Sequence, residues 1–462
     1  MNNTILFACG RDFAAGNCEH LRPDEAIGRG ALVLADDCQQ GSFVSPVVHM
    51  DDFSTVVCSW NTDVPAGTWS ETFCRVQDQQ GQWSDWLSWG VWGPFVKRGS
   101  LNETDGGIAT VETDTLSLKE EHTGKALQLK VVLHREEGAA APVLRLVAAT
   151  TRLSAEDRFP NVEPKCSLDN PAPAYCQGIR DPNIGFGMCS ATTATVQMNS
   201  MGADLLPEEA AMACWDHTYR GHGNWAFTMA MAGSFGFETW LSFGNPDQLR
   251  AELKKGHPIG VNAAYSNTPE RATAHAPYVE NTPGFTNGHL LTARGLEVDA
   301  EGREWLLVND SYGNPDSQAP RRYPLEQFVK AWSGMMYIVR PRLPGAGSGS
   351  PYRVPAKLKP TNFGDEFLLE VDGQELPLDP HFNGGHRCCT GIVASYMDDP
   401  YLYPTTANRP FWYTKVTANG NIFLPAKAML RLSPLGERAV LHVFIINDRG
   451  ITYTAQLRMS DL

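Results

Sequence analysis

The sequence predicts a multidomain protein in which an α+β domain lies between two domains made mainly of β-strands. Its 462 residues suggest about three domains of ordinary size. Helical patterns first appear after about residue 155, and a stretch rich in Gly, Ser and Pro begins near residue 343. We therefore expect a β-domain at 1–155, an α+β domain at 156–343, a linker at 344–351 and a second β-domain at 352–462.

The N-terminal domain is expected to be a sandwich or a jelly roll. Short runs rich in β-branched and aromatic residues alternate there with turn-forming clusters, a pattern typical of strands. The clearest runs are Ser54–Trp60, Thr68–Val76 and Ala126–His134. The C-terminal β-domain is predicted from Phe367–Val371, Ala428–Leu432, Val440–Ile446 and Thr452–Leu457.

The middle of the chain mixes helical and strand patterns, which predicts the α+β layout. The helical patterns cover Leu206–Tyr219, Pro246–Lys255 and Pro324–Trp332. A strand is indicated at Ile259–Ala263, and two adjacent strands are indicated at His289–Leu296 and Trp305–Asn309.

The composition limits the expected partners and the expected compartment. Lys and Arg total 38 against 52 Asp and Glu, and the formal net charge of −14 argues against a nucleic-acid backbone as partner. There is no apolar run of about 18 residues, and the N-terminus lacks the cationic start of a signal peptide. We therefore expect a cytoplasmic protein without a membrane partner. The 11 cysteines show no framework spacing and should mostly be free thiols. The oligomeric state stays open.

Two further patterns have simpler interpretations. A row of tryptophans that could stack on sugars comprises Trp83, Trp86, Trp89 and Trp92. Because a spacing of three follows no single face of a strand, core packing is favoured. A cluster of candidate metal ligands comprises His381, His386, Cys388 and Cys389, but adjacent cysteines serve one tetrahedral site poorly. We expect no metal site and, without a phosphate-binding loop or dinucleotide fingerprint, no cofactor.

Cys189 is the candidate nucleophile. It follows the glycines of Gly185-Phe-Gly-Met-Cys189 and begins a predicted helix, whose apolar face comprises Ala191, Ala194, Met198 and Met201. The positive end of the helix dipole lowers the pKa of a thiol in the first turn and favours the thiolate, the form that attacks. Gly187 lets a substrate backbone come close. The alternative is a buried structural cysteine.

His289 is the candidate base. It follows Gly288 and begins an apolar strand, where its imidazole can face a cleft; a capping or core histidine is the alternative. The next strand ends in Asn309-Asp310, and because strand side chains alternate, only one of these two can orient His289. Gln177 lies upstream of Cys189 and can donate a hydrogen bond to a developing oxyanion, alongside the Cys189 backbone N–H.

The order Gln, Cys, His, Asp in these contexts resembles the papain-fold cysteine peptidases. The branch it resembles comprises the bacteriocin-processing (double-glycine) peptidases, family C-thirty-nine. The matching motifs are Gln177, Cys189-Ser-Ala-Thr-Thr, Gly288-His289-Leu-Leu and Asn309-Asp310-Ser. The resemblance implies a papain-like α+β catalytic domain, preceded by the β-sandwich or jelly roll. The C-terminal β-domain is predicted from its strand patterns and lies outside the resemblance. The resemblance also implies a Cys189–His289–Asp310 triad with Gln177 in the oxyanion hole, no cofactor and a peptide or other amide substrate. Asp310-Ser-Tyr-Gly313 is also similar to the papain Asn-Ser-Trp-Gly, which favours Asp310 over Asn309.

The resemblance extends over roughly residues 40–340. The segment from His217 to Trp225, together with Ser59-Trp60-Asn61 and Trp83-Ser-Asp-Trp86, is similar to larger bacterial members with an N-terminal β-domain. We expect the substrate to be contacted by Gly187, Gly288, Asn224 and Trp225. Two departures put the usual loop geometry in question, because Ala191 and Ser311 stand where the family has proline.

Two other functions remain compatible with these motifs. The same apparatus can pass an acyl group to an amine or a thiol, which would make the protein a papain-fold acyltransferase. A peptide- or glycan-binding protein with an inactive site is the second alternative. Thiol reactivity separates the enzymes from the binding protein, and acyl transfer to added amines separates the transferase from the hydrolase.

Overall fold

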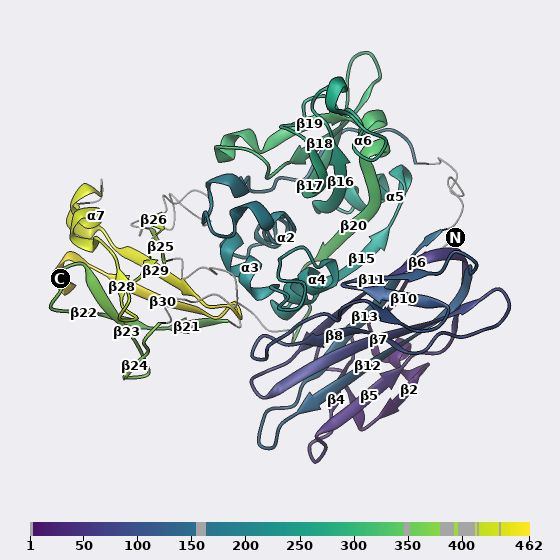
Figure 1. The fold of residues 1–462 in the computed structure, drawn as a ribbon, viewed down its shortest axis with the longest axis horizontal. Coiled ribbons are helices and arrows are strands. Elements are labelled where there is room, and N and C mark those ends of the chain that lie inside the picture. Colours follow the sequence, from purple (N-terminus) through teal and green to yellow (C-terminus); the bar gives the residue numbers. More distant parts are fainter. Residues whose placement is uncertain are drawn as a thin grey trace.

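The computed structural model describes residues 3–153, 163–345, 352–378, 392–395, 412–413, 415–433 and 436–462. Figure 1 shows its strands in three groups, coloured purple to blue, teal to green, and green to yellow along the chain. These groups correspond to the N-terminal, middle and C-terminal segments. Among the described residues the middle segment, which mixes helices and strands, is therefore preceded and followed by segments made mainly of strands.

The N-terminal strands form one large sheet, in which β12 pairs with both β6 and β7. The predicted strands at Ser54–Trp60, Thr68–Val76 and Ala126–His134 lie within these three and are confirmed. The elements are β1 (Thr4–Phe7), α1 (Gly10–Ala14), β2 (Asn17–Glu19), β3 (Leu21–Asp24), β4 (Ala31–Leu34), β5 (Gln40–Val44), β6 (Val48–Asp63), β7 (Thr68–Asp78), β8 (Leu87–Trp92), β9 (Thr104–Asp105), β10 (Ala109–Glu112), β11 (Thr115–Leu118), β12 (Gly124–Arg135) and β13 (Val143–Leu153).

The tryptophan row does not form one platform. Trp89 and Trp92 are fully buried in the N-terminal core. Trp83 and Trp86 both stack on the guanidinium of Arg75, each with its ring centroid 4.8 Å from that group. Since Arg75 already covers these two rings, the arrangement agrees with packing rather than with sugar stacking.

The middle segment folds into an antiparallel sheet in the order β15-β20-β16-β17-β18-β19, with β14 paired to β17. The helices α2, α3 and α4 precede β15 in the chain. The elements are β14 (Leu168–Asp169), α2 (Cys189–Ser200), α3 (Pro207–Ala213), α4 (Trp225–Ser234), β15 (Glu238–Phe243), α5 (Pro246–Leu253), β16 (Ile259–Tyr265), β17 (Thr286–Val298), β18 (Glu304–Asn309), β19 (Pro320–Pro324), α6 (Leu325–Ala331) and β20 (Trp332–Arg340).

The C-terminal strands form two small sheets among the described residues, ordered β21-β30-β29-β25-β26 and β22-β23-β28-β27, with β24 paired to β23. The elements are β21 (Arg353–Pro355), β22 (Lys357–Pro360), β23 (Glu366–Val371), β24 (Gln374–Glu375), β25 (Ile392–Ser395), β26 (Trp412–Tyr413), β27 (Lys415–Val416), β28 (Ile422–Phe423), α7 (Ala426–Leu432), β29 (Leu441–Ile446) and β30 (Thr452–Leu457).

Two sequence predictions of secondary structure are wrong. The strand expected at Ala428–Leu432 is helix α7, because its alanine, lysine, methionine and leucine residues favour a helix and its apolar face packs into the C-terminal core. The helix expected at Leu206–Tyr219 ends at Ala213. Beyond it, Asp216 pairs with Gly221 in an isolated bridge, so the chain turns back on itself instead of continuing the helix.

The N-terminal sheet and the helices of the middle segment share one core. The ring of Phe227 on α4 lies 5.2 Å from that of Trp92 and 6.1 Å from that of Trp60, measured between centroids. The fully buried Arg98 donates from Nε to the carbonyl of Trp215 at 2.9 Å, and its other nitrogens donate to the carbonyls of Met212 and Arg449. One N-terminal side chain thus bonds main chain from the middle and the C-terminal segments.

Candidate active site

Cys189 is the first residue of α2 and is partly exposed. The turn before it packs tightly, because a Cβ on Gly185 would lie 2.6 Å from the carbonyl oxygen of Gln177. Glycine at 185 therefore allows the two segments to meet. The helix is buried on every side from Ser190 to Asn199, not on one apolar face as the sequence predicts. As the first helical residue, Cys189 has a backbone N–H without a partner inside the helix.

His289 lies on β17 and is 4% exposed. Its Nε2 is 2.9 Å from Oδ1 of Asp310, and its ring also hydrogen-bonds the thiol of Cys189. Because Nε2 is engaged by Asp310, Nδ1 is the nitrogen left to face the sulfur. The structure thus brings together three of the residues predicted from the sequence in one hydrogen-bonded chain.

Asp310 follows the last residue of β18 and is fully buried. Its Oδ1 accepts from the backbone N–H of Tyr312 at 2.8 Å, and its Oδ2 accepts from the hydroxyls of Tyr265 and Tyr323, each at 2.7 Å. The neighbouring Asn309 points away from this cluster and donates to the carbonyls at 172 and 173. Of the two adjacent candidates, Asp310 is therefore the one that contacts His289.

The two tyrosines were not predicted. They lie on β16 and β19, well separated from Asp310 in sequence, and only the order of the sheet brings them to it. Tyr265 ends an apolar strand, a position that many structural tyrosines share, and Tyr323 lies within a polar strand that gives no such signal. Their effect is to fill the hydrogen-bonding capacity of a buried carboxylate, which would otherwise be costly to bury.

The electrostatics of the site favour an ion pair between sulfur and imidazole. Burial acts to raise the pKa of the Cys189 thiol, but the hydrogen bond and the charge of His289 outweigh it and hold that pKa below its ordinary value. Burial acts to lower the pKa of His289, yet the charge of Asp310, its hydrogen bond and Cys189 raise it to about 10. Both shifts favour the thiolate–imidazolium pair over the neutral thiol and imidazole.

Gln177 is buried, and a hydrogen bond holds each end of its side-chain amide. Its Oε1 accepts from the hydroxyl of Ser311 at 2.8 Å, and its Nε2 donates to the carbonyl of Phe186 at 3.2 Å. An amide nitrogen carries two hydrogens, so one N–H remains for another acceptor. Ser311, one of the two departures from the expected motif, fixes which end of the amide carries the nitrogen.

Cys189 opens onto a cleft of about 560 Å³. Three of the four predicted substrate contacts line it, namely Gly187, Gly288 and Trp225. The prediction for Asn224 is wrong. That side chain is fully buried, accepts from the N–H of Phe227 as the N-cap of α4 and donates to Asp216. An asparagine before a helix forms this cap so often that the pattern alone does not place it in a cleft.

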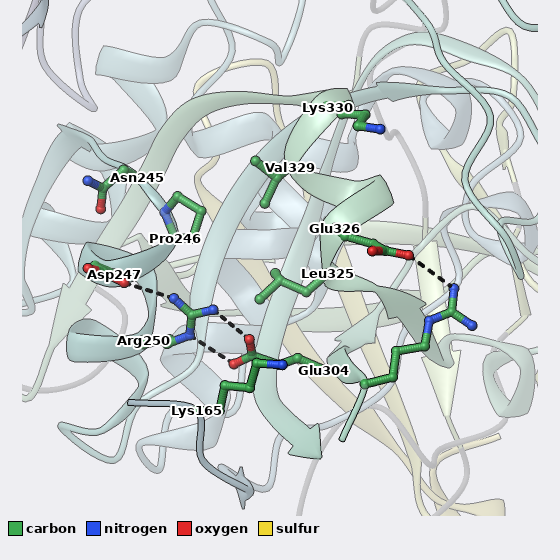
Figure 2. Close-up of a pocket in the computed structure, with 11 residues that line it drawn as sticks. Lys165, Asn245, Pro246, Asp247, Arg250, Glu304, Leu325, Glu326, Val329 and Lys330 are labelled. Atoms are coloured by element: carbon green, nitrogen blue, oxygen red, sulfur yellow. Dashed lines mark hydrogen bonds and ion pairs between the residues drawn. The ribbon is translucent and has the colours of Figure 1, made fainter. Parts of the chain in front are cut away.

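A second cavity of about 460 Å³ lies between α5 and α6 (Figure 2). Arg250 dominates it and donates to Oε1 of Glu304 and to Oδ1 of Asp247, both at 2.8 Å. These three side chains are nearly buried and satisfy one another. Arg250, Glu304 and Asp247 therefore form a closed ion-pair network at this cavity.

The described residues contain no group of three His, Cys, Asp or Glu side chains that could hold a metal ion. The cluster at His381, His386, Cys388 and Cys389 lies outside the described residues. Within the same ranges, no helix has the length and apolar character needed to cross a membrane. The nine described cysteines are free thiols.

Comparison with known proteins relates both large segments to one group of peptidases. Residues 170–338 match the Peptidase C39 like family, and residues 11–152 match the Peptidase C39 N-terminal domain. No curated protein matches the chain.

Among solved structures, the peptidase domain of Streptococcus ComA is 14% identical, and the match covers 35% of this chain and 96% of that domain with a TM-score of 0.26. Bromelain from Ananas comosus is 16% identical over 40% of this chain and 92% of its own, with a TM-score of 0.22. A recombinant stem bromelain precursor is 17% identical over 40% and 74%, with a TM-score of 0.28.

The family matches identify the class of the protein. The chain is a papain-like cysteine peptidase. It is related to the C39 peptidases, and its residues 11–152 match the Peptidase C39 N-terminal domain.

Proposed function

We propose that the protein hydrolyses peptide bonds through a triad of Cys189, His289 and Asp310. The observation that carries the proposal is the hydrogen-bonded chain from the Cys189 thiol through His289 to the buried Asp310. Asp310 holds the imidazole with Nδ1 toward the sulfur and stabilises its positive charge. The free face of the sulfur opens onto the cleft that Gly187, Gly288 and Trp225 line.

In the first half-reaction the Cys189 thiolate attacks the carbonyl carbon of the scissile bond. The oxyanion receives hydrogen bonds from the backbone N–H of Cys189 and the available N–H of Gln177. His289 then gives its proton to the leaving amine, and a thioester with Cys189 remains. In the second half, His289 takes a proton from water, the hydroxide attacks the thioester, and the thiol and the carboxylic acid are released.

A peptide substrate agrees with the surface around the site. Exposed apolar side chains on loops that contribute to the site comprise Ile179, Phe186, Tyr219 and Tyr312. Phe186 and Tyr219 line the cleft itself, and exposed apolar groups at a cleft mark a binding surface. We propose that an extended chain lies along these side chains, with its backbone passing the glycines at 187 and 288.

We also propose that the domain boundaries lie near 155 and 343–352, and that the N-terminal sheet folds as a sandwich. Support comes from the sheets, which occupy residues 4–153, 168–340 and 353–457 without sharing strands among the described residues.

Alkylation of the folded protein with limiting iodoacetamide tests the proposed nucleophile. Cys189 should be labelled ahead of the other cysteines, and its rate should already be high below the ordinary pKa of a thiol, because His289 lowers the pKa of Cys189. In a His289→Ala variant that pKa rises, so labelling at neutral pH should slow while labelling at high pH recovers. Mass spectrometry locates the label. Labelling of Cys9 first, with Cys189 untouched in folded protein, would contradict the proposal.

A further inference from the structure

The cleft beside Cys189 has an uneven charge. Among the described residues that line it, Arg220 alone is a lysine, arginine, aspartate or glutamate. Its side chain is exposed, and its guanidinium has no ion pair or hydrogen bond within the described part of the chain. The protein as a whole carries a formal net charge of −14. Asp114 and Asp216 accept from the backbone N–H groups of Trp225 and Tyr219, but neither carboxylate lines the cleft. Arg220 is therefore the charged group that the cleft presents, although the protein as a whole is acidic.

Arg220 does not sit on a loose loop. The buried Asp216 accepts from the backbone N–H groups of Thr218 and Tyr219 and from that of Ser100 in the N-terminal segment. The carbonyl of Asp216 accepts from the N–H of Arg220 at 2.7 Å. The carboxylate and the carbonyl of Asp216 thus hold the backbone of the loop at 218–220, and the N–H of Ser100 in the N-terminal segment holds that carboxylate in place.

The backbone of Arg220 is held in the left-handed region, with φ of 60°. A residue other than glycine is uncommon there, and such residues gather at functional sites. The loop has glycine at the next position, Gly221, where a Cβ would lie 2.6 Å from the ring of Tyr219. The chain therefore places arginine in the unfavourable conformation although it uses glycine one residue later.

From this geometry we propose that Arg220 binds a carboxylate of the peptide substrate, and that the peptidase prefers acidic peptides for this reason. The inference rests on the proposed function, because it concerns a substrate held beside Cys189. An arginine fork matches the geometry of a carboxylate and pairs with it through two N–H groups. The carboxylate belongs either to an acidic side chain or to the C-terminus of the substrate.

The first arm of the test compares two alkylating reagents at Cys189. In each reaction the thiolate displaces iodide and forms a C–S bond, but iodoacetate is an anion and iodoacetamide is neutral. Wild type should prefer iodoacetate, and Arg220→Gln should reduce the iodoacetate-to-iodoacetamide rate ratio roughly three- to tenfold, the scale of one screened charge. Added salt should narrow the difference between the two proteins.

Arg322→Gln is the matched control. It removes one exposed cation from the same segment, on β19 and outside the residues that line the cleft. Its rate ratio should equal that of wild type. An unchanged ratio in Arg220→Gln, or an equal fall in Arg322→Gln, would overturn the inference while leaving the nucleophile intact. If neither reagent labels Cys189 in wild type, the proposed function fails and the inference falls with it.

The second arm identifies the source of the carboxylate. A peptide library contains each sequence in three forms: neutral with an amidated C-terminus, the same with one Gln replaced by Glu, and neutral with a free C-terminal carboxylate. Cleavage of competing forms is followed by mass spectrometry. Preference for the second form assigns a side chain and preference for the third assigns the terminus, provided that Arg220→Gln abolishes it. Equal cleavage of all three forms by wild type would overturn a role in peptide recognition.

Discussion

Two buried clusters of charge lie in the papain-like segment and differ in how completely they are paired. At the second cavity, Arg250 is held between Glu304 and Asp247, and the hydrogen bond that it donates to Glu304 is the main reason that the pKa of Arg250 is raised. At the candidate active site, Asp310 is equally buried, but the imidazole it holds faces a sulfur that opens onto a cleft. The charges around Arg250 are paired with one another, whereas the cluster around Asp310 leaves the sulfur of Cys189 open to a substrate.

The difference shows what separates a structural ion pair from a reactive one. Both clusters perturb pKa values, so the perturbation alone would not tell them apart. The distinguishing feature is a partly exposed nucleophile at the end of the chain of hydrogen bonds. Substitutions in the two clusters should therefore separate turnover from stability.

The largest expected effect on turnover concerns Asp310. Asp310→Asn keeps a hydrogen-bonding oxygen but removes the charge that stabilises the imidazolium, and turnover should fall roughly 10²–10⁴-fold. Asp310→Ala should lower it further, because the ring is then free to rotate. Steady-state kinetics on any cleaved peptide, with melting temperatures alongside, measure the effect.

Asn309→Ala is the control for this substitution. It removes contacts to the carbonyls at 172 and 173 and should cost about 1 kcal/mol of stability, the size of an average substitution, with little change in turnover. Loss of turnover in a folded Asn309→Ala protein, with turnover retained in Asp310→Ala, would reverse the assignment.

A smaller loss is expected at the oxyanion donor. Gln177→Ala should lower kcat roughly 10²–10³-fold, the usual cost of one such donor, with little change in melting temperature. Ser311→Ala should lower kcat less than Gln177→Ala does, by the equivalent of about 1 kcal/mol for one hydrogen bond. The reason is that the backbone hydrogen bond between Gln177 and Ser311 remains. If Gln177→Ala stays within a few-fold of wild type, Gln177 is only a structural residue.

The smallest effect on turnover is expected at the self-paired cluster. Glu304→Gln leaves Arg250 with less compensating charge, and breaking a buried pair costs roughly 3–5 kcal/mol of unfolding free energy. In the protein that remains folded, kcat should equal that of wild type. Lys119→Gln, which breaks an exposed pair with Asp105, should barely change the denaturant midpoint. A large fall in kcat for folded Glu304→Gln would show that the two clusters are coupled.

The sequence predicted which residues form the site better than it predicted how they are arranged. The order of Gln177, Cys189 and His289 was readable because each stands at the beginning of an element or in a distinctive motif. The choice between Asn309 and Asp310 was a question of register, which depends on where β18 ends. Residue types and spacing do not predict the last residue of β18, although the similarity to the papain motif favoured Asp310.

Other features depended on tertiary contacts that local patterns do not encode. Tyr265 and Tyr323 reach Asp310 only through the order of strands in the sheet. Asn224 before Trp225 looks the same in sequence whether it faces a cleft or caps α4. The strand segments of the flanking regions were readable, since their periodicity is local, but the helix at Ala426–Leu432 was missed because a short apolar run fits either structure.

The hydrogen bonds of Arg98 connect the three segments of the chain in a way that the family matches do not show. The first family match ends at residue 152 and the second begins at residue 170, which suggests a division of the chain between them. Division would take the guanidinium of Arg98 away from the carbonyls of Met212, Trp215 and Arg449, and would expose the ring of Phe227 that Trp92 covers. The protein would lose these buried hydrogen bonds and would expose apolar surface to water. We therefore expect residues 163–345 to be less stable without the N-terminal segment than in the whole chain, which denaturant unfolding of the two proteins would measure.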